Sequence, residues 1–549
     1  MFNTLNRYYH SVRHLRLCQI VYRIYYRIRY IHVISFPGNL PQTTRFEWTG
    51  QIFLSQRYFD HDRVCFLGEE ATIAHANDWN NLEKSKLWLY NLHYFDDLNA
   101  NNSESRVEAH RRLIHRWIAE NQPAIGNGWE PYPISLRLVN WIKWYSRERV
   151  NDDLIVKSIV QQSDALVKQL EYHILGNHLL ANAKALVFVG TFLKGGSAEK
   201  SLVLGLKILR REIQDQFLAD GGHFELSPLY HAIMLWDLLD LINLVQVSRN
   251  QKLMAEVASW KVVATKAIKW LQVMTHPDGE ISFFNDSAIG IAASPSKIFA
   301  YGQQLGLVIP EELSQPHVAL NASGYSRINM TGHAAIIDHA AVGPDYLPGH
   351  AHADSLSFEW SVGMQRVLVN SGTSLYGVST ERLRQRQTAA HNTVVVDGKD
   401  SSEVWSGFRV ARRAYSKLTH VHAVTNRVVL TMSHTGYRRF PGKVIHERVI
   451  SAAETELQIT DHLQGHFKQA EALFHLHPDI IAHPVDEQHL KLLLPSGTEV
   501  FIRSDSPIEI TESTWHPQFG VSLPNKRLKV VFKTGKVQVT FSLVAGSGT

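Results

Sequence analysis

Residues 349–358 read Gly-His-Ala-His-Ala-Asp-Ser-Leu-Ser-Phe, with His350, His352 and Asp354 at every second position. This alternation predicts a strand that presents all three polar side chains on one face. Imidazole and carboxylate groups serve as metal ligands and as proton-transfer groups. The spacing therefore predicts a metal site, a proton-transfer site or both, although a solvated outer strand face would give the same pattern.

Residues 220–231 combine a Gly-Gly turn with a Ser-Pro helix start and contain Glu225 and Tyr230. Tyr230 falls in the first turn of the predicted helix, where its phenol can point into a cleft. A desolvated phenol, or one near a cation, is a suitable acid for an alkoxide leaving group. A tyrosine that closes a helix–helix interface would have the same sequence, so both interpretations stay open.

The polar pair Asn177-His178 interrupts an apolar run and opens a helix rich in alanine. Taken alone, this position favours a buried, hydrogen-bonded cap over a side chain aimed into a cavity. Two other stretches, residues 90–96 and 127–133, gather aromatic and amide side chains, among them Tyr94 and Trp129. We expect them to be loops, with a composition that suits carbohydrate binding.

These residues must be positioned by two kinds of element. Between residues 76 and 315 the apolar residues recur at helical spacing, which predicts stacked helical hairpins in a solenoid or toroid. From residue 316 to 549 the spacing changes to two, which predicts an antiparallel β-sandwich. The predicted helices are residues 105–121, 133–147, 153–193, 201–218, 230–248 and 252–275, and the predicted strands are 334–338, 393–398, 427–431, 490–494 and 528–532.

The composition is that of an ordinary globular protein of more than one domain, with 549 residues, 44% hydrophobic and 19% charged. A net charge of +5 suits an acidic polymer, but the clustered basic stripe of a nucleic-acid-binding protein is missing. Two cysteines imply no disulfide framework. No stretch is predicted to reach the length of a membrane-spanning helix.

Residues 1–75 form a separate lead-in whose first 46 residues contain seven arginines and no acidic residue before Glu47. The segment lacks the apolar core and cleavage site of a secretory signal, which favours a cytoplasmic or membrane-associated protein over a secreted one. Residues 1–30 could form a basic amphipathic helix on an anionic membrane or on a partner. A basic helix packed on the body of the protein is the other interpretation.

Taken together, the chain resembles the heparinase II/III family of polysaccharide lyases, from about Tyr90 to about Arg413. The resemblance implies an α/α toroid followed by a C-terminal antiparallel β-sandwich, with an active site in the cleft between them. It is carried by residues 90–97, 129–140, 177–178, 225–230, 285–286, 350–358 and 386–393.

The activity that the resemblance implies is β-elimination at a uronic acid, in which the C5 proton is removed and the 4-O glycosidic oxygen is expelled. It assigns Asn177 to neutralising the uronate carboxylate, which stabilises the enolate-like intermediate. It makes Tyr230 and His350 the acid–base pair, in an order set by the C5 epimer. The residues expected to bind the acidic polysaccharide are His178, Trp129, Tyr94, Glu225 and Arg386, the last by adding positive charge.

The resemblance also implies a metal, usually zinc, held by His352, His391 and a third residue that is an aspartate in the family. This chain has Asn370 at the third position. An amide oxygen is a poorer zinc ligand than a carboxylate, so any metal here is predicted to be weakly held, and to brace the sheet near His350. No organic cofactor is expected.

Two other functions remain open. A glycoside hydrolase on an α/α toroid would need two carboxylates across a cleft, for which Glu225, Asp220, Asp286 and Glu130 are candidates. A non-catalytic protein that binds or assembles a polysaccharide would keep its function without Tyr230 and His350. The preferred hypothesis is a lyase for a uronic-acid-containing polysaccharide, acting in the metabolism of an exopolysaccharide or capsule.

Overall fold

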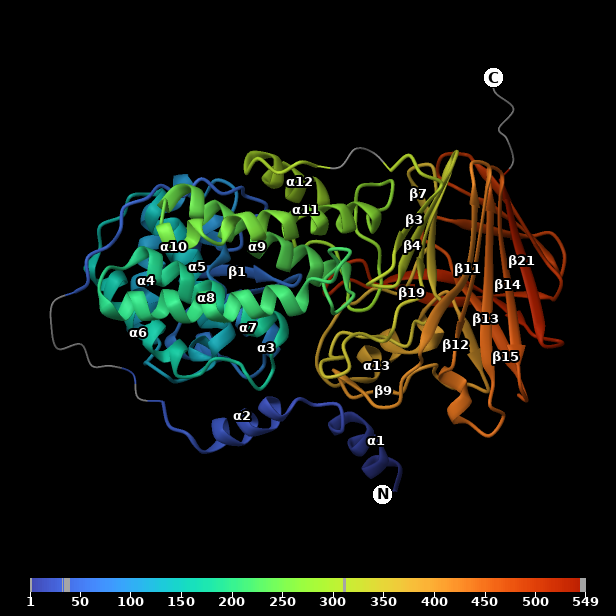
Figure 1. The fold of residues 1–549 in the computed structure, drawn as a ribbon, viewed down its shortest axis with the longest axis horizontal. Helices are drawn as coiled ribbons and strands as arrows, with labels where there is room; N and C mark the ends of the chain where they lie inside the picture. The colour runs from blue at the N-terminus through green and yellow to red at the C-terminus, as the bar shows by residue number, and fades with distance from the viewer. Residues whose placement is uncertain (1, 32, 34–39, 310–312, 544–549) are drawn as a thin grey trace.

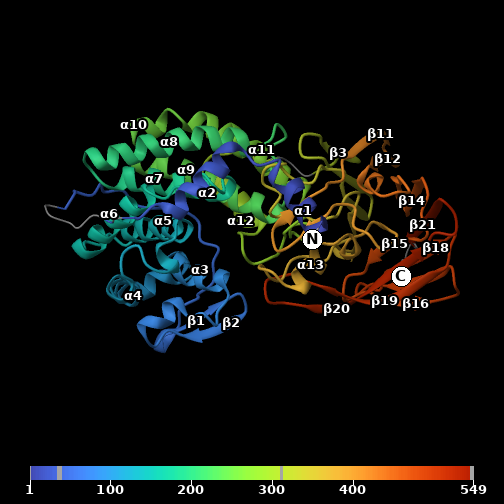
Figure 2. The same ribbon diagram turned by 90° about the horizontal axis from the view of Figure 1, so that it is seen from below.

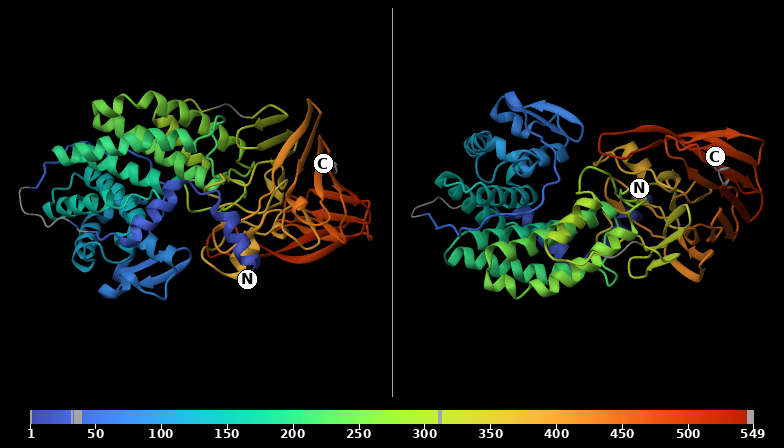
Figure 3. Two further views of the ribbon diagram at one scale, coloured as in Figure 1. Left: turned by 60° about the horizontal axis from the view of Figure 1, so that its bottom comes forward. Right: turned by 90° about the horizontal axis from the view of Figure 1, so that it is seen from above.

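A computed structural model describes residues 2–31, 33, 40–309 and 313–543, and Figure 1 shows a helical half followed by a half built of sheets. Antiparallel sheets follow the helices, as the change of apolar spacing predicts. Two helices, α1 (Phe2–Val12) and α2 (Leu17–Ile28), precede both halves and run along the outside of the molecule (Figures 2 and 3). A small hairpin of β1 (Arg63–Phe66) and β2 (Glu69–Thr72) leads into the helices.

The helical half packs its helices against one another in sequence order, α7 on α5 and α8, and α9 on α11 and α12. Their bounds are α3 (Lys86–Tyr94), α4 (Val107–Glu120), α5 (Pro131–Arg147), α6 (Asp153–Val167), α7 (Gly176–Phe192), α8 (Gly196–Gln216), α9 (Pro228–Ser248), α10 (Gln251–Met254), α11 (Val257–Val273) and α12 (Pro295–Gln304). The predicted helical stretch 153–193 is two helices, because residues 168–175 form a turn between them that ends at Leu175, whose φ of 71° is outside the helical range.

Helix α9 is 21 residues long and apolar enough to cross a membrane by length and composition, so the prediction that no stretch reaches this length is wrong. In the structure 83% of its apolar window is buried. A helix that is apolar on all sides is typical of the centre of a large domain. Helix α9 is thus a central helix of the helical core, and its first turn carries Tyr230.

All strand pairs of the second half are antiparallel. In the described residues the sheet nearest the helices (Figure 1) has the order β3-β4-β5-β6-β7, and two further sheets have the orders β19-β20-β15-β8 and β11-β12-β13-β14-β21-β18-β17-β16. The bounds are β3 (His317–Leu320), β4 (Tyr325–Met330), β5 (His333–Asp338), β6 (Phe358–Val362), β7 (Gln365–Leu368), β8 (Val394–Val396), β11 (Ser416–Val424), β12 (Arg427–His434), β13 (Ile445–Ala453), β14 (Glu456–Gln464), β15 (Ala470–His475), β16 (Ile481–Pro484), β17 (His489–Leu493), β18 (Glu499–Ser504), β19 (Ile508–Trp515), β20 (Leu523–Val531) and β21 (Lys536–Leu543).

The core of this half lies between the facing sheets. In β12 alternate residues point inward, so that Val428, Leu430 and Met432 are buried. Strands β5, β6 and β8 are buried at every position. Trp360 and Phe541 meet across the core with their ring centroids 5.5 Å apart. Helix α13 (Thr380–Arg386) and the short ribbon of β9 (Val404–Trp405) and β10 (Arg409–Val410) connect the sheets and lie near the helical half.

Candidate active site

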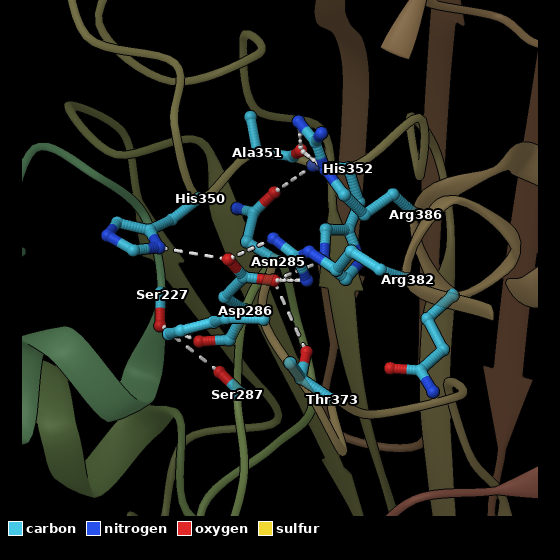
Figure 4. A network of polar contacts seen from close by, with 12 residues as sticks. Ser227, Asn285, Asp286, Ser287, His350, Ala351, His352, Thr373, Arg382 and Arg386 are labelled. Carbon is cyan, nitrogen blue, oxygen red and sulfur yellow. Dashed lines mark hydrogen bonds and ion pairs between the residues drawn. The ribbon is translucent and has the colours of Figure 1, made fainter. Parts of the chain in front are cut away.

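The carboxylate of Asp286 is the centre of the polar network in Figure 4. It is fully buried and forms a two-point ion pair with Arg382, whose Nη2 lies 2.6 Å from Oδ2. It also accepts hydrogen bonds from His350 Nδ1 at 2.9 Å, His352 Nε2 at 2.8 Å and Thr373 Oγ1 at 3.3 Å. Burial alone would raise the pKa of Asp286, but Arg382 and the two imidazoles hold it well below its usual range. Asp286 is therefore an ionised anchor for both imidazoles.

The loop that carries the two histidines is irregular. Residues 349–357 precede β6, so the prediction of a single polar strand face is wrong. Leu356 has a φ of 63°, which breaks any extended conformation. The loop is held by the turn at Asn285 instead: His352 N–H donates to Asn285 Oδ1 at 3.0 Å, and Asp286 N–H donates to His350 O at 3.0 Å. The polar residues converge because they share this turn.

Tyr230 is placed by the start of α9. Pro228 occupies the first turn, and the Ser227 hydroxyl accepts from Tyr230 N–H at 3.2 Å, as the Ser-Pro sequence predicts. The same hydroxyl donates to the carbonyl oxygen of Asp286 at 2.6 Å. One serine therefore fixes both the helix that carries the phenol and the turn that anchors His350.

Tyr230 and His350 lie face to face, with ring centroids 3.8 Å apart and an angle of 27° between the planes. The phenol oxygen of Tyr230 lies 2.9 Å from that of Tyr376, whose ring packs on Phe408 and Phe519. Burial, and then the neighbouring phenol, raise the pKa of Tyr230 well above its usual range, so the phenol is protonated near neutral pH. Because Asp286 accepts from Nδ1, a neutral His350 has its lone pair on Nε2. A proton donor and a proton acceptor thus adjoin one another.

Asn177 and Glu225 form the wall beside this pair. Glu225 Oε2 lies 3.6 Å from His350 Nε2, and the backbone of Asn177 is near enough to favour the ionised form of Glu225. Burial raises the pKa of Glu225. Gly176 has a φ of 58°, and a Cβ there would lie 2.5 Å from Leu347 Cδ2 and 3.3 Å from Glu225 Oε1. Only glycine lets the start of α7 approach so closely.

His178 follows on α7 and lies at the partly exposed edge of the same wall. Its Nδ1 donates to Glu171 Oε1 at 2.8 Å, and its ring lies 4.4 Å from that of Tyr132. Burial opposes the charge, but attraction to Glu171 and this hydrogen bond raise the pKa of His178 above its usual value. The site can therefore present a cation beside Asn177.

Three residues expected to bind substrate lie elsewhere. Arg386 is fully buried and donates to the carbonyl oxygen of Ala351 at 2.9 Å, so it supports the His350 loop and does not face a sugar. Trp129 lies inside the helical core, stacked on Trp117 with centroids 5.9 Å apart. Tyr94 is 7% exposed and ends helix α3, so the prediction of a loop there is wrong.

The sequence interpretation missed Arg382 and Tyr376. Arg382, Arg384 and Arg386 alternate along α13, and nothing in their spacing tells which one meets a carboxylate. The N-cap Ser379 fixes where the helix begins and so which arginine points at Asp286. Tyr376 sits in a loop with no neighbouring motif, and its role depends on a contact made 146 residues away.

The metal ligands implied by the resemblance do come together. His352 Nδ1 lies 3.3 Å from His391 Nε2, close to the separation of roughly 3.3 Å expected for two nitrogen ligands of one tetrahedral zinc. Asn370 Oδ1, however, lies 3.4 Å from the other nitrogen of His391 and accepts from Asn392 N–H. The described residues contain no group of three or more His, Cys, Asp or Glu able to hold a metal ion. Two imidazoles fall short of a complete zinc site.

Models of the heparinase II/III N-terminus and of the heparinase II/III-like C-terminal region match residues 65–304 and 313–543. The heparin-sulfate lyase of Bacteroides thetaiotaomicron is 27% identical over 209 residues, 33% of this chain and 29% of that protein. That of Bacteroides stercoris is 25% identical over 258 residues, 43% of this chain and 38% of that protein. The chain thus matches well under half the length of these relatives.

Solved structures share the fold. A crystal structure of heparinase III superposes with a TM-score of 0.69 at 17% identity, covering 85% of this chain and 79% of that one. Heparan sulfate lyase HepC from Pedobacter heparinus gives a TM-score of 0.58 at 17% identity, with 89% and 82% covered. The expected α/α toroid followed by an antiparallel β-sandwich is confirmed. With both of its halves matched, the chain belongs to the heparinase II/III family.

Proposed function

We propose that this protein is a polysaccharide lyase that cleaves a uronic-acid-containing polysaccharide by β-elimination. The observation that carries the proposal is the contact of Tyr230 with His350, which places a protonated phenol against an imidazole held by Asp286. Such a pair can remove one proton and supply another on the same sugar. The relatives named as heparin-sulfate lyases support this reaction class.

The reaction begins at C5 of the uronate, whose proton is weakly acidic because a carboxylate adjoins it. The Asn177 amide and the His178 cation would neutralise that carboxylate and stabilise the enolate-like intermediate. The base takes the C5 proton, the electron pair forms the C4–C5 double bond, the C4–O4 bond breaks, and the acid protonates O4. Whether His350 or Tyr230 is the base depends on which face of the ring carries the C5 proton, and so on the C5 epimer.

Hydrolysis fits the same site less well. Asp286 is ion-paired with Arg382 and has no exposed surface, so it cannot exchange protons with a sugar. Glu130 forms an ion pair with Lys86, and Asp220 accepts hydrogen bonds from Ser323. Of the four candidates only Glu225 remains beside His350, whereas a glycoside hydrolase needs two carboxyl groups across the scissile bond.

We also propose a substrate and a location for the protein. The substrate is an acidic exopolysaccharide or capsule made by the cell itself, and the protein is cytoplasmic or associated with a membrane. The net charge of +5 suits an acidic polymer. Zinc, where it binds, is held by His352 and His391 beside Asn370 and braces the loop that carries His350.

Two variants test the acid–base pair on a panel of uronate polymers. Tyr230→Phe and His350→Ala should each abolish the ultraviolet-absorbing product of elimination in protein that is still folded, because both groups act on the transition state. Each variant also loses one buried hydrogen bond, to Tyr376 or to Asp286, so its thermal midpoint should fall by only a few degrees. Turnover close to that of the wild type in either variant would contradict the assignment. A non-catalytic binding protein would form no such product from any polymer.

A further inference from the structure

Helices α1 and α2, residues 2–30, form a segment that we call the strap, because it crosses both halves of the chain (Figure 3). Helix α1 lies on the β-sandwich half, where Arg7 pairs with Glu403 at 3.0 Å. Helix α2 lies on the helical half, where the ring of Tyr22 packs 4.8 Å from that of Tyr172. The strap is therefore docked on the protein body, one of the two interpretations open from the sequence.

Helix α2 packs on the body through Cys18, Tyr22 and Tyr26, and it leaves a second apolar stripe facing outward. A surface helix of a globular protein normally turns its apolar stripe toward the core. The inner side of α2 carries Gln19, whose amide donates to the carbonyl oxygens of Ile174 and Tyr346. Its apolar stripe faces outward at spacings of four, three and four residues: Leu17 is 75% exposed, Val21 51%, Ile24 60% and Ile28 78%.

Helix α1 repeats this arrangement. Leu5, Tyr9 and Val12 lie one helical turn apart and are all exposed, while Ser11 faces the body and donates to Val410 O. An apolar stripe of this length, exposed on two consecutive helices, is not expected of a surface that meets only water. A partner must cover it.

The charge of the strap identifies the partner. Residues 1–46 contain seven arginines and no acid, and Arg13, Arg23 and Arg27 are exposed beside the apolar stripe. Of the acidic residues of the body near α2, Asp215 pairs with Arg16, and Glu171 pairs with His178. An apolar stripe flanked by arginines is the composition of helices that lie in the interface of an anionic bilayer.

We propose that the strap is an interfacial anchor that binds an anionic lipid bilayer through this outward stripe. The exposed aliphatic side chains enter the boundary between headgroups and acyl chains, and the arginines meet lipid phosphates. Gln19 bonds to Ile174, two residues before Gly176, and to Tyr346, beside the Leu347 that contacts Gly176. The anchored strap would thus contact the segments that adjoin the start of α7, where Asn177 and His178 lie.

Sedimentation of the full chain with vesicles tests the anchor, and the result does not depend on any enzymatic activity. The wild type should bind vesicles of phosphatidylcholine mixed equally with phosphatidylglycerol, and should not bind phosphatidylcholine alone. The double variant Val21→Ser/Ile24→Ser should weaken binding on the order of tenfold or more, because it removes the buried apolar area. Arg23→Gln/Arg27→Gln should weaken it about fivefold per arginine at low salt and less at high salt.

The matched controls are Leu82→Ser and Met364→Ser, which remove apolar side chains that are 95% and 68% exposed outside the strap. Both should bind vesicles like the wild type, and every variant should keep its thermal midpoint because each changed residue is exposed. Equal binding of the wild type and Val21→Ser/Ile24→Ser would overturn the proposal. So would a wild-type dimer that the same double variant converts to a monomer, because a second copy would then cover the stripe.

Discussion

Tyr376→Phe removes one oxygen atom and isolates the contact between the two phenols. The Tyr376 hydroxyl lies 2.9 Å from that of Tyr230, and the phenylalanine ring would keep its packing against Phe408 and Phe519. The phenol of Tyr230 would lose its hydrogen-bond partner. The variant therefore removes the hydrogen bond to Tyr230 and keeps the packing of the ring at position 376.

The expected size of the effect follows from that single hydrogen bond. A hydrogen bond contributes about 1 kcal/mol of net stability, whereas leaving a buried polar group without its partner costs about 1–3 kcal/mol. If that larger cost falls on the transition state, kcat drops roughly 5- to 150-fold, with a much smaller change in KM. The thermal midpoint should fall by only a few degrees.

The assay is the initial rate of ultraviolet-absorbing product against pH, on the best polymer of the panel. Tyr301→Phe is the matched control, because its buried hydroxyl donates to Asp240 at 3.1 Å inside the helical half. It should lose comparable stability and keep kcat. An unchanged kcat and pH profile in Tyr376→Phe would refute the positioning role, and an equal loss of kcat in Tyr301→Phe would show that instability alone explains it.

Three further predictions concern other parts of the site. Asn177→Ala should lower kcat far more than it raises KM, whereas a purely structural Asn177 would show lost stability with normal specific activity in the folded fraction. Glu171 raises the pKa of His178, so the imidazole stays charged above its ordinary pH range. Its contribution to the rate is lost only as the pH rises through that raised pKa. His178→Gln should remove this alkaline limb of the pH–rate profile, and an unchanged limb would show that the His178 cation does not contribute to the rate. Purified wild type should carry less than one zinc per chain by elemental analysis, and Asn370→Asp should raise both zinc content and thermal midpoint; full occupancy in the wild type would contradict the weak site.

The sequence predicted the two halves and the start of α9 because local signals determine them. The apolar spacing changes from helical to alternating, and Ser227-Pro228 marks the helix start that places Tyr230. The conformation of the His350 loop could not be predicted in this way. Its alternating sequence is typical of a strand, but the turn at Asn285 and Asp286, distant in the sequence, overrides that preference.

The direction in which individual side chains point could not be predicted from the sequence either. Arg386 and Trp129 match motif positions, yet whether a side chain faces a cleft or the core depends on helix rotation and packing. Arg382 and Tyr376 were missed for the same reason, because each acts through a residue far away in the chain. Residue type and order singled out Tyr230 and His350, which do come into contact, but they did not predict which way Arg386 and Trp129 point.

In the proposed reaction the protein cleaves the glycosidic bond by elimination. Elimination adds no water to the products, whereas hydrolysis adds one oxygen from solvent at each cleaved bond. Digestion of a uronate polymer in water enriched in oxygen-18, with immediate reduction of the reducing ends to stop exchange of the anomeric oxygen, followed by mass spectrometry, should give unsaturated products without the label, and none with Tyr230→Phe. Labelled, saturated oligosaccharides from the wild-type protein would contradict the assignment of Tyr230 and His350 as the acid–base pair of a lyase.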